Sequence, residues 1–295
     1  MDKWVVYILL AVCLSSCGQA SGNKQVKQGT DSLQNDTVVS HSVDSLAYAY
    51  LKSGRIMYEN GDKLGAIAKY NKAIEIDPLY MLAYYNRGLS KSKIGDNQGA
   101  IDDYSKAIQI NPQYIKAYFN RGLIKSKLGD NKEAIVDYSK AIQINPQYIK
   151  AYFNRGNCKS KLGDKEGAIS DYNKAIELDA QNINAYINLG VEKYELGDYE
   201  GEIATYRLAI KNCSPDADLY NNLGRALYDL KRFKEAAEAY GEGIKAFPND
   251  GKLYYGRGLA RNRLGDKNGA CEDWHRSSEL GCLQANALLL LCGEK

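Results

Sequence analysis

The chain contains 295 residues, of which 39 are basic and 36 are acidic, and its formal net charge at pH 7 is +3. A charge so close to balance creates no long-range positive field, so the composition does not favour nucleic acid as a partner. The sequence contains only two histidines and shows neither a nucleophile motif nor a phosphate-binding loop. It therefore predicts no enzyme, no cofactor and no metal site.

Residues 1–16 have the pattern of a signal peptide. Lys3 precedes an apolar run from Trp4 to Leu14 that is too short to span a bilayer. The run ends in the sequence LSSC at residues 14–17, which resembles the lipobox of bacterial lipoproteins, in which a lipidated cysteine follows the cleavage site. The alternative is an ordinary secretory signal with a chance cysteine. We expect a lipid on Cys17, which would anchor the protein in a bacterial cell envelope, on the periplasmic face of the outer membrane.

Residues 17–46 have the composition of a flexible linker behind this lipidated cysteine. The stretch is rich in Ser, Gln, Asn, Lys and Thr and has few apolar residues, so it cannot bury enough surface to fold alone. Random-coil statistics give a tether of about 30 Å between the lipid and the folded part. His41 lies in this stretch, far in sequence from His275, which argues against a metal site built on the two histidines.

A 34-residue pattern recurs seven times over residues 47–282. A tyrosine stands at position 4 and a glycine at position 8 of all seven repeats, and an aromatic residue stands at position 24. Gly-Asp at positions 15 and 16 of six repeats supplies a left-handed stop for one helix and an N-cap for the next. A period of this length indicates a solenoid of helix-turn-helix units. We number the repeats 1 to 7 from their first residues, Ala47, Met81, Ile115, Ile149, Ile183, Ala217 and Gly251.

This pattern resembles the tetratricopeptide repeat, whose further marks are Ala at positions 20 and 27 and Pro at position 32. The resemblance implies an all-α fold, an α-solenoid of seven repeats, whose first helices line a concave groove that binds peptides or helices of partner proteins. Large tyrosine rings at positions 4 and 24 would fill the core, with hydroxyl groups that find polar neighbours. In repeat 3 the matching residues are Tyr118, Gly122, Gly129, Ala134, Tyr138, Ala141 and Pro146.

Repeats 2, 3, 4 and 7 depart from the family at two positions that change together. They carry Arg at position 7 and Asp at position 23, for example Arg121 and Asp137, where the family usually has apolar or aromatic residues. Repeats 1, 5 and 6 have neither. Joint presence or absence indicates an ion pair between two helices, because a lone member would be left unpaired. Lys125 at position 11 lies one turn beyond the arginine and is expected to share the carboxylate.

The resemblance places positions 2, 5, 6, 9, 12 and 13 of each repeat on the concave face. An asparagine amide there can both donate to and accept from an extended backbone. Repeats 5 and 6 carry Glu195, Asp218 and Asp229 at matching places, so we expect a groove that is basic in the middle and acidic toward its C-terminal half. The alternative is that these charges only keep the surface soluble. The candidate partner-binding residues in repeats 2 to 4 are Tyr85, Asn86, Lys93, Lys116, Phe119, Asn120, Lys127, Lys150, Phe153, Asn154 and Lys161.

Residues 283–295 are expected to form a capping helix and tail. Leu283 to Cys292 is an apolar stretch of helix length, and the end of a repeat array needs a cover for its last interface. Cys271 lies ten residues before Gly281 and Cys292 eleven residues after it, so antiparallel packing would bring the two cysteines side by side. We expect a disulfide between them in an oxidising envelope.

These observations predict a lipid-anchored scaffold that holds a protein or peptide, with an acidic segment, in its concave groove. Two alternatives belong to other classes. One is a self-associating structural envelope protein, which the near-identical repeats 3 and 4 and the apolar tail would favour if the tail formed no cap. The other is an enzyme, which would need a convergent set of titratable groups, whereas the carboxylates here stand at repeat-periodic positions.

Overall fold

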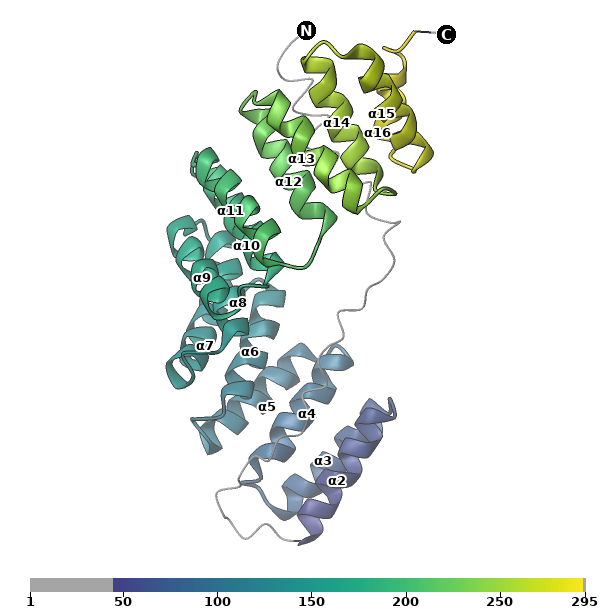
Figure 1. Cartoon of the computed structure of the whole chain (residues 1–295). Coiled ribbons are helices and arrows are strands. Elements are labelled where there is room, and N and C mark those ends of the chain that lie inside the picture. Colours follow the sequence, from purple (N-terminus) through teal and green to yellow (C-terminus); the bar gives the residue numbers. More distant parts are fainter. Residues whose placement is uncertain (1–44, 294–295) are drawn as a thin grey trace. The chain divides into compact units, whose positions relative to one another are not determined.

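The computed structural model describes residues 45–293, and every regular element in that range is an α-helix (Figure 1). The described helices belong to two compact units, one ending at Asp179 and the other beginning at Ala180. The N-terminal unit contains α2 (Ser45–Glu59), α3 (Lys63–Ile76), α4 (Met81–Lys93), α5 (Asn97–Ile110), α6 (Ile115–Leu128), α7 (Asn131–Ile144), α8 (Ile149–Lys161) and α9 (Lys165–Leu178). The C-terminal unit contains α10 (Ile183–Glu195), α11 (Tyr199–Asn212), α12 (Ala217–Asp229), α13 (Phe233–Ala246), α14 (Gly251–Arg263), α15 (Lys267–Glu279) and α16 (Gln284–Leu289).

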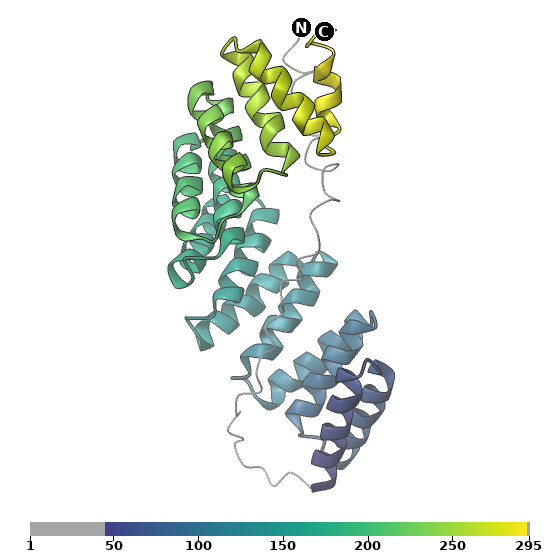
Figure 2. The same cartoon turned by 45° about the vertical axis from the view of Figure 1, so that its right-hand side comes forward.

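Each repeat is a pair of packed helices joined by a short turn, which confirms the predicted α-solenoid. Helices α6 and α7, for example, form repeat 3 and lie side by side in both views (Figures 1 and 2). From α4 onward, the first helix of every repeat begins at the first position of that repeat. The exception is α2, which already begins at Ser45, so the last two residues of the expected linker are helical. The expected signal peptide and Cys17 lie outside the described residues.

Position 15 ends the first helix of a repeat with a left-handed residue. Gly129 has a φ of 94°, a conformation that only glycine adopts without strain. Repeat 6 has Lys231 instead, which adopts a φ of 62° and is the one described non-glycine residue with a positive φ. Holding a lysine in this region costs about 1 kcal/mol relative to glycine.

The aspartate at position 16 caps the second helix only where position 19 is glycine. Gly99 N donates to Asp96 Oδ1 at 2.9 Å, and a Cβ built on Gly99 would lie 2.2 Å from the other carboxylate oxygen. Repeat 3 has Glu133 at position 19, and the side chain of Asp130 makes no capping hydrogen bond. The prediction of an N-cap is therefore confirmed for Asp96 and wrong for Asp130, because a side chain at position 19 occupies the place of the carboxylate.

Small residues at positions 8, 20 and 27 make room for the tyrosine at position 24. The ring of Tyr138 is fully buried between helices, and a Cβ added to Gly122 would lie 2.8 Å from it. Ala134 and Ala141 are also fully buried. The Tyr138 hydroxyl has no hydrogen-bond partner in the described protein, contrary to expectation, and burial raises the pKa of Tyr138 well above its usual value. Packing volume, rather than a hydrogen bond, accounts for this tyrosine.

A short helix covers the last repeat, as predicted, but it is shorter than the apolar stretch that forms it. Helix α16 spans six residues and buries Ala285 against Ala270 and Trp274 of α15. A disulfide joins Cys271 of α15 to Cys292 just beyond α16. The remaining leucines of the stretch are not covered: the exposed fractions are 68% for Leu283, 86% for Leu290 and 67% for Leu291.

Candidate partner-binding surface

The predicted partner-binding residues lie on three first helices of the N-terminal unit, α4, α6 and α8. The side-chain amide of Asn120 on α6 donates to the hydroxyl of Tyr85 on α4 at 2.9 Å, which links the first two. Helix α8 contacts α6 in turn. The structure therefore brings these residues together on neighbouring helices: Tyr85, Asn86 and Lys93 on α4, Lys116, Phe119, Asn120 and Lys127 on α6, and Lys150, Phe153, Asn154 and Lys161 on α8.

One set of cations on these helices is neutralised within the scaffold. Arg121 on α6 holds Asp137 on α7 through two contacts, Nε to Oδ2 at 3.0 Å and Nη2 to Oδ1 at 2.6 Å. Lys125 Nζ lies 2.9 Å from the same carboxylate. The Asp137 side chain is only 1% exposed, so removing its partners would leave a buried charge. The predicted pair, and the sharing of its carboxylate by position 11, are confirmed.

The same arginine also connects neighbouring repeats. Arg121 Nη1 donates to the hydroxyl of Ser105 in repeat 2 at 2.8 Å. The same contact occurs in repeats 2 and 4. Arg87 donates to the side-chain oxygen of Asn71 at 2.6 Å, and Arg155 donates to the hydroxyl of Ser139 at 3.0 Å. Because this row of arginines is bonded to partners inside the array, it belongs to the scaffold and not to a binding surface.

A second set of cations is left without compensation. Its members stand at positions 2 and 13, are exposed, and form no ion pair with the residues that the structure describes. Eleven residues separate the two positions, so the two rows stand about 16 Å apart along a helix axis. The five lysines concerned are Lys93, Lys116, Lys127, Lys150 and Lys161.

The aromatic residues at position 5 are only half-buried, and they pack onto their own scaffold. Phe119 lies 5.8 Å from the ring of Tyr138 and 5.2 Å from that of Tyr148, between ring centroids. Phe153 lies 6.0 Å from Tyr172 in the same way. The part of each ring that a partner can reach is therefore smaller than the sequence suggests.

Leu123 is an exposed apolar residue that is not among the predicted partner-binding residues. It stands at position 9 of α6, one turn after Phe119 and one turn before Lys127, and 37% of it is exposed. Residues four apart lie on one face of a helix, so Leu123 continues the apolar strip between the two lysine rows. The sequence could have identified Leu123, because position 9 is one of the positions that the family places on the concave face.

The asparagines at position 6 are partly engaged. Asn86 donates to the carbonyl of Leu82 at 2.7 Å, and Asn154 donates to that of Lys150 at 2.8 Å, each one turn earlier in its own helix. A side-chain amide has two N–H donors and one acceptor oxygen. Each of these amides uses one N–H within its own helix, so the second N–H and the oxygen are available to a partner.

Comparisons with known proteins identify the repeat. Sequence models described as tetratricopeptide repeat or TPR repeat match residues 54–95, 92–129, 115–148, 149–182, 183–214 and 217–250. Together these matches cover well over half of the chain. The chain belongs to the tetratricopeptide repeat family. No curated protein matches its sequence at a significant level.

Solved tetratricopeptide repeat structures superpose on much of the chain. One from Parabacteroides merdae does so with a TM-score of 0.57 at 20% identity, covering 84% of this chain and 99% of that one. PilF of Pseudomonas aeruginosa superposes with a TM-score of 0.56 at 18% sequence identity, and the match covers 72% of this chain and 97% of PilF. YrrB, described as a TPR protein with an unusual peptide-binding site, superposes with a TM-score of 0.51 at 18% sequence identity. The match covers 63% of this chain and 96% of YrrB. At these identities the likeness shows the fold alone.

The first helices of the C-terminal unit present a different charge pattern from those of α4, α6 and α8. Asp218 on α12 lies 3.8 Å from Lys252 on α14, and Arg263 on α14 donates to the hydroxyl of Tyr228 on α12 at 3.0 Å. Asp218, expected to make the groove acidic, is thus partly neutralised. This tetratricopeptide repeat surface is a mixed network and not a row of one sign.

A carboxyl group is buried on α11 of the same unit. Glu202 stands at position 20, where the other six repeats have alanine, and it is 1% exposed. Arg225 Nη2 lies 3.9 Å from its Oε1, and that oxygen accepts no hydrogen bond in the described protein. Burial raises the pKa of Glu202 to about 7, an effect that Arg225 opposes and Asp229 reinforces.

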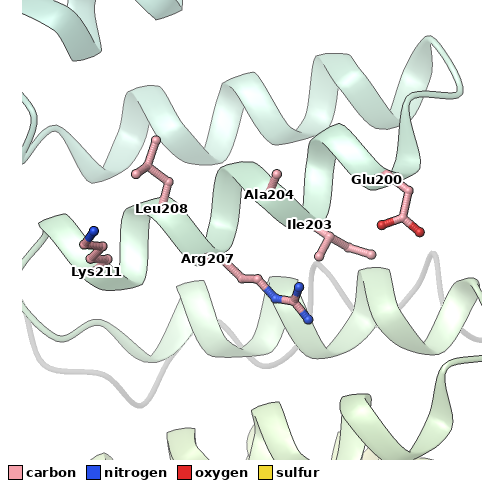
Figure 3. A pocket seen from close by; sticks show the side chains of 6 residues that line it. All are labelled: Glu200, Ile203, Ala204, Arg207, Leu208 and Lys211. Carbon is pink, nitrogen blue, oxygen red and sulfur yellow. The ribbon is translucent and has the colours of Figure 1, made fainter.

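The second helix of repeat 5 bears a shallow hollow of about 390 Å³, lined by six side chains that all project from α11 (Figure 3). Two of its three charged side chains are already paired: Arg232 Nη1 lies 2.9 Å from Glu200, and Arg207 Nη2 lies 3.0 Å from Glu235. No side-chain cluster with metal-ligand chemistry occurs within residues 45–293. In the same range, every helix is too short or too polar to cross a bilayer.

Proposed function

We propose that this tetratricopeptide repeat protein is a lipid-anchored scaffold whose helices α4, α6 and α8 bind an acidic peptide or helix of a partner protein. The single observation that carries the proposal is the division of the basic residues on these helices. Arg121 and Lys125 share a buried carboxylate, whereas the neighbouring Lys116 and Lys127 are exposed and unpaired within the described residues. The fold uses the first group, and the second group is available to a partner.

The arrangement suits a segment that is acidic at its edges and apolar along its middle. Two lysine rows about 16 Å apart, by helix geometry, would each receive carboxylates. Leu123 and the reachable edges of Phe119 and Phe153 lie between the rows and would contact apolar side chains. Charge complementarity of this kind speeds association and sets orientation, while desolvated apolar anchors supply most of the affinity.

Family membership supports a binding role rather than catalysis. Tetratricopeptide repeat proteins hold peptides or helices of partners, and YrrB, which shares the fold, is itself described as having a peptide-binding site. The carboxylates nearest the proposed surface, such as Asp137, are held by ion pairs within the scaffold. They are therefore engaged in structure and are poorly placed to act as general acids or bases.

Lipid anchoring is the part of the proposal that rests on sequence alone. The LSSC motif behind a short apolar run supports lipidation of Cys17, and each buried methylene would add about 0.8 kcal/mol of membrane affinity. Metabolic labelling with a fatty acid should mark the wild type and leave the Cys17→Ala variant unlabelled. Equal labelling of both would contradict the anchor.

Site-specific photocrosslinking in living cells tests the binding surface. A photoreactive residue at Leu123 should capture one dominant partner, and the crosslinked peptide should be acidic by mass spectrometry. Val136 on α7 is a matched control, because it is apolar and 54% exposed but lies on a second helix. The same capture from both positions, or capture from Val136 alone, would place the partner elsewhere.

A further inference from the structure

The first helix of each repeat uses two positions to pack on the repeat before it. In repeat 3, Ala117 at position 3 and Ile124 at position 10 belong to the cluster of Ala100 and Tyr104 from α5. Repeat 4 does the same with Ala151 and Cys158. Wherever the preceding repeat lies in the same compact unit, position 3 is at most 1% exposed and position 10 at most 5% exposed. These two positions therefore mark the face that joins one repeat to the previous one.

Helix α2 presents this joining face, and among the described residues no repeat precedes it. Ile56 at position 10 is 50% exposed, Ala49 at position 3 is exposed, and Leu46 is 53% exposed. With Ser53 these residues follow one another at spacings of three, four and three, which forms a single uncharged stripe along the helix. The stripe has the chemistry of an interior junction and lies at the surface of the described protein.

The surface that follows the last repeat in the chain is also apolar. Terminal repeats of solenoids need a polar outer face to stay soluble, yet Leu283, Leu290 and Leu291 around α16 are each more than 60% exposed. The chain carries no charged residue from Leu280 to Cys292. Helix α16 thus covers α15 but leaves a new apolar surface exposed on its own outer side.

We propose that the two end faces bind each other between copies of this chain, with the α2 stripe of one copy on the leucines around α16 of the next. Both faces are uncharged and apolar, and the contact continues the repeat-to-repeat packing that already holds each array together. Such a head-to-tail contact joins two different surfaces, so it propagates into open chains or rings rather than stopping at a dimer. The inference is independent of the proposed partner surface, since it uses none of the residues on α4, α6 or α8.

Single-face variants separate this arrangement from its alternatives. Sedimentation equilibrium of residues 18–295, which carry neither the signal peptide nor the lipid, should show a mass that increases with concentration above that of the monomer. Ile56→Glu and Leu290→Glu should each weaken assembly by about tenfold or more, because each places a charge in a desolvated contact. Val136→Glu, on an exposed apolar site away from both ends, should assemble like the wild type.

A mixture of the two end variants gives the decisive result. Each variant retains one intact face, so the mixture should form a 1:1 pair that grows no further, and this pairing also shows that both variants are folded. In isotopically mixed protein, a photoreactive residue at Ile56 should crosslink to residues 283–293 of a different copy. Assembly lost in only one end variant, no pairing in the mixture, or a monomer at all concentrations would overturn the proposal.

Discussion

Repeats 2 to 4 of the N-terminal unit and repeats 5 and 6 of the C-terminal unit follow the same pattern but handle charge in different ways, while repeat 7 keeps the buried pair of the N-terminal unit in Arg257 and Asp273. In the N-terminal unit, three successive repeats bury an arginine, a lysine and an aspartate together, as Arg121, Lys125 and Asp137 do, and leave a separate set of lysines exposed. Repeats 5 and 6 of the C-terminal unit lack that pair and instead bury Glu202 beside Arg225. A charge at a repeat-periodic position is therefore structural where a partner within the array reaches it, and stays at the surface where none does.

The largest expected effect comes from breaking the buried pair of the N-terminal unit. Asp137→Leu should lower the free energy of unfolding by about 3 kcal/mol, because it leaves Arg121 and Lys125 without their carboxylate. The Arg121→Leu, Asp137→Leu double variant should lose less than the sum of the single losses. Urea denaturation of the four proteins measures the coupling, and additive losses would show that the two residues act separately.

The C-terminal unit should respond to pH through Glu202. Its pKa is raised to about 7 from 4.5, so between these values the folded chain holds a proton that the unfolded chain has released. The free energy of unfolding should therefore fall as pH rises through this window, by at most about 3 kcal/mol, and level off above it. Glu202→Gln and Glu202→Ala should both flatten the profile. An unchanged slope in Glu202→Gln would assign the pH dependence to other groups.

A smaller effect should come from the close approach of helices around the tyrosine at position 24. Gly122→Ala should destabilise the N-terminal unit by about 1 to 2 kcal/mol, because the added methyl meets the buried Tyr138 ring and the overpacking outweighs the gain in helix propensity. Gly241→Ala is the matched change in the C-terminal unit, where the nearest atom to the new Cβ is Arg257 Nη1 at 3.9 Å. Thermal melting should show this second variant to be as stable as the wild type or more stable.

The smallest expected effect concerns the turn of repeat 6. Lys231→Gly should raise the free energy of unfolding by about 1 kcal/mol, because it relieves the left-handed strain of a lysine. The reciprocal Gly129→Lys change in the N-terminal unit should lower it by a similar amount. Denaturant melts of both variants check the pair, and a neutral result for each would mean that the turn absorbs the strain elsewhere.

The sequence was sufficient for features that follow from the repeat period. It predicted the helix pairs and the bond between Arg121 and Asp137, because joint variation at two positions reflects a contact within each repeat. It was not sufficient for features that depend on how far neighbouring side chains cover one another. The period places Phe119 and Leu123 on the same face, but only the structure shows that Phe119 packs against Tyr148 and that Leu123 is the more exposed of the two.

The N-cap of repeat 3 and the end cap show the same limit. Asp130 has the sequence of a capping residue, yet the side chain of Glu133 displaces its hydrogen bond. The apolar stretch near the C-terminus has the length of a full helix, yet only six residues are helical and Leu290 stays exposed. In both cases the sequence pattern predicted the right type of structure. A neighbouring side chain prevented the capping hydrogen bond of Asp130, and the lack of a facing surface leaves the end of the apolar stretch exposed.

Charge reversal on the N-terminal unit tests the central claim most directly. Lys127→Glu with Lys150→Glu should weaken capture of the partner crosslinked at Leu123 by about tenfold or more and remove most of its salt dependence, at unchanged helix content. The control pair Lys132→Glu with Lys140→Glu makes the same change of charge on exposed sites of α7 and should leave capture within about twofold. Equal loss in both pairs, or no loss in either, would contradict the assignment of the exposed lysines of α4, α6 and α8 to partner binding.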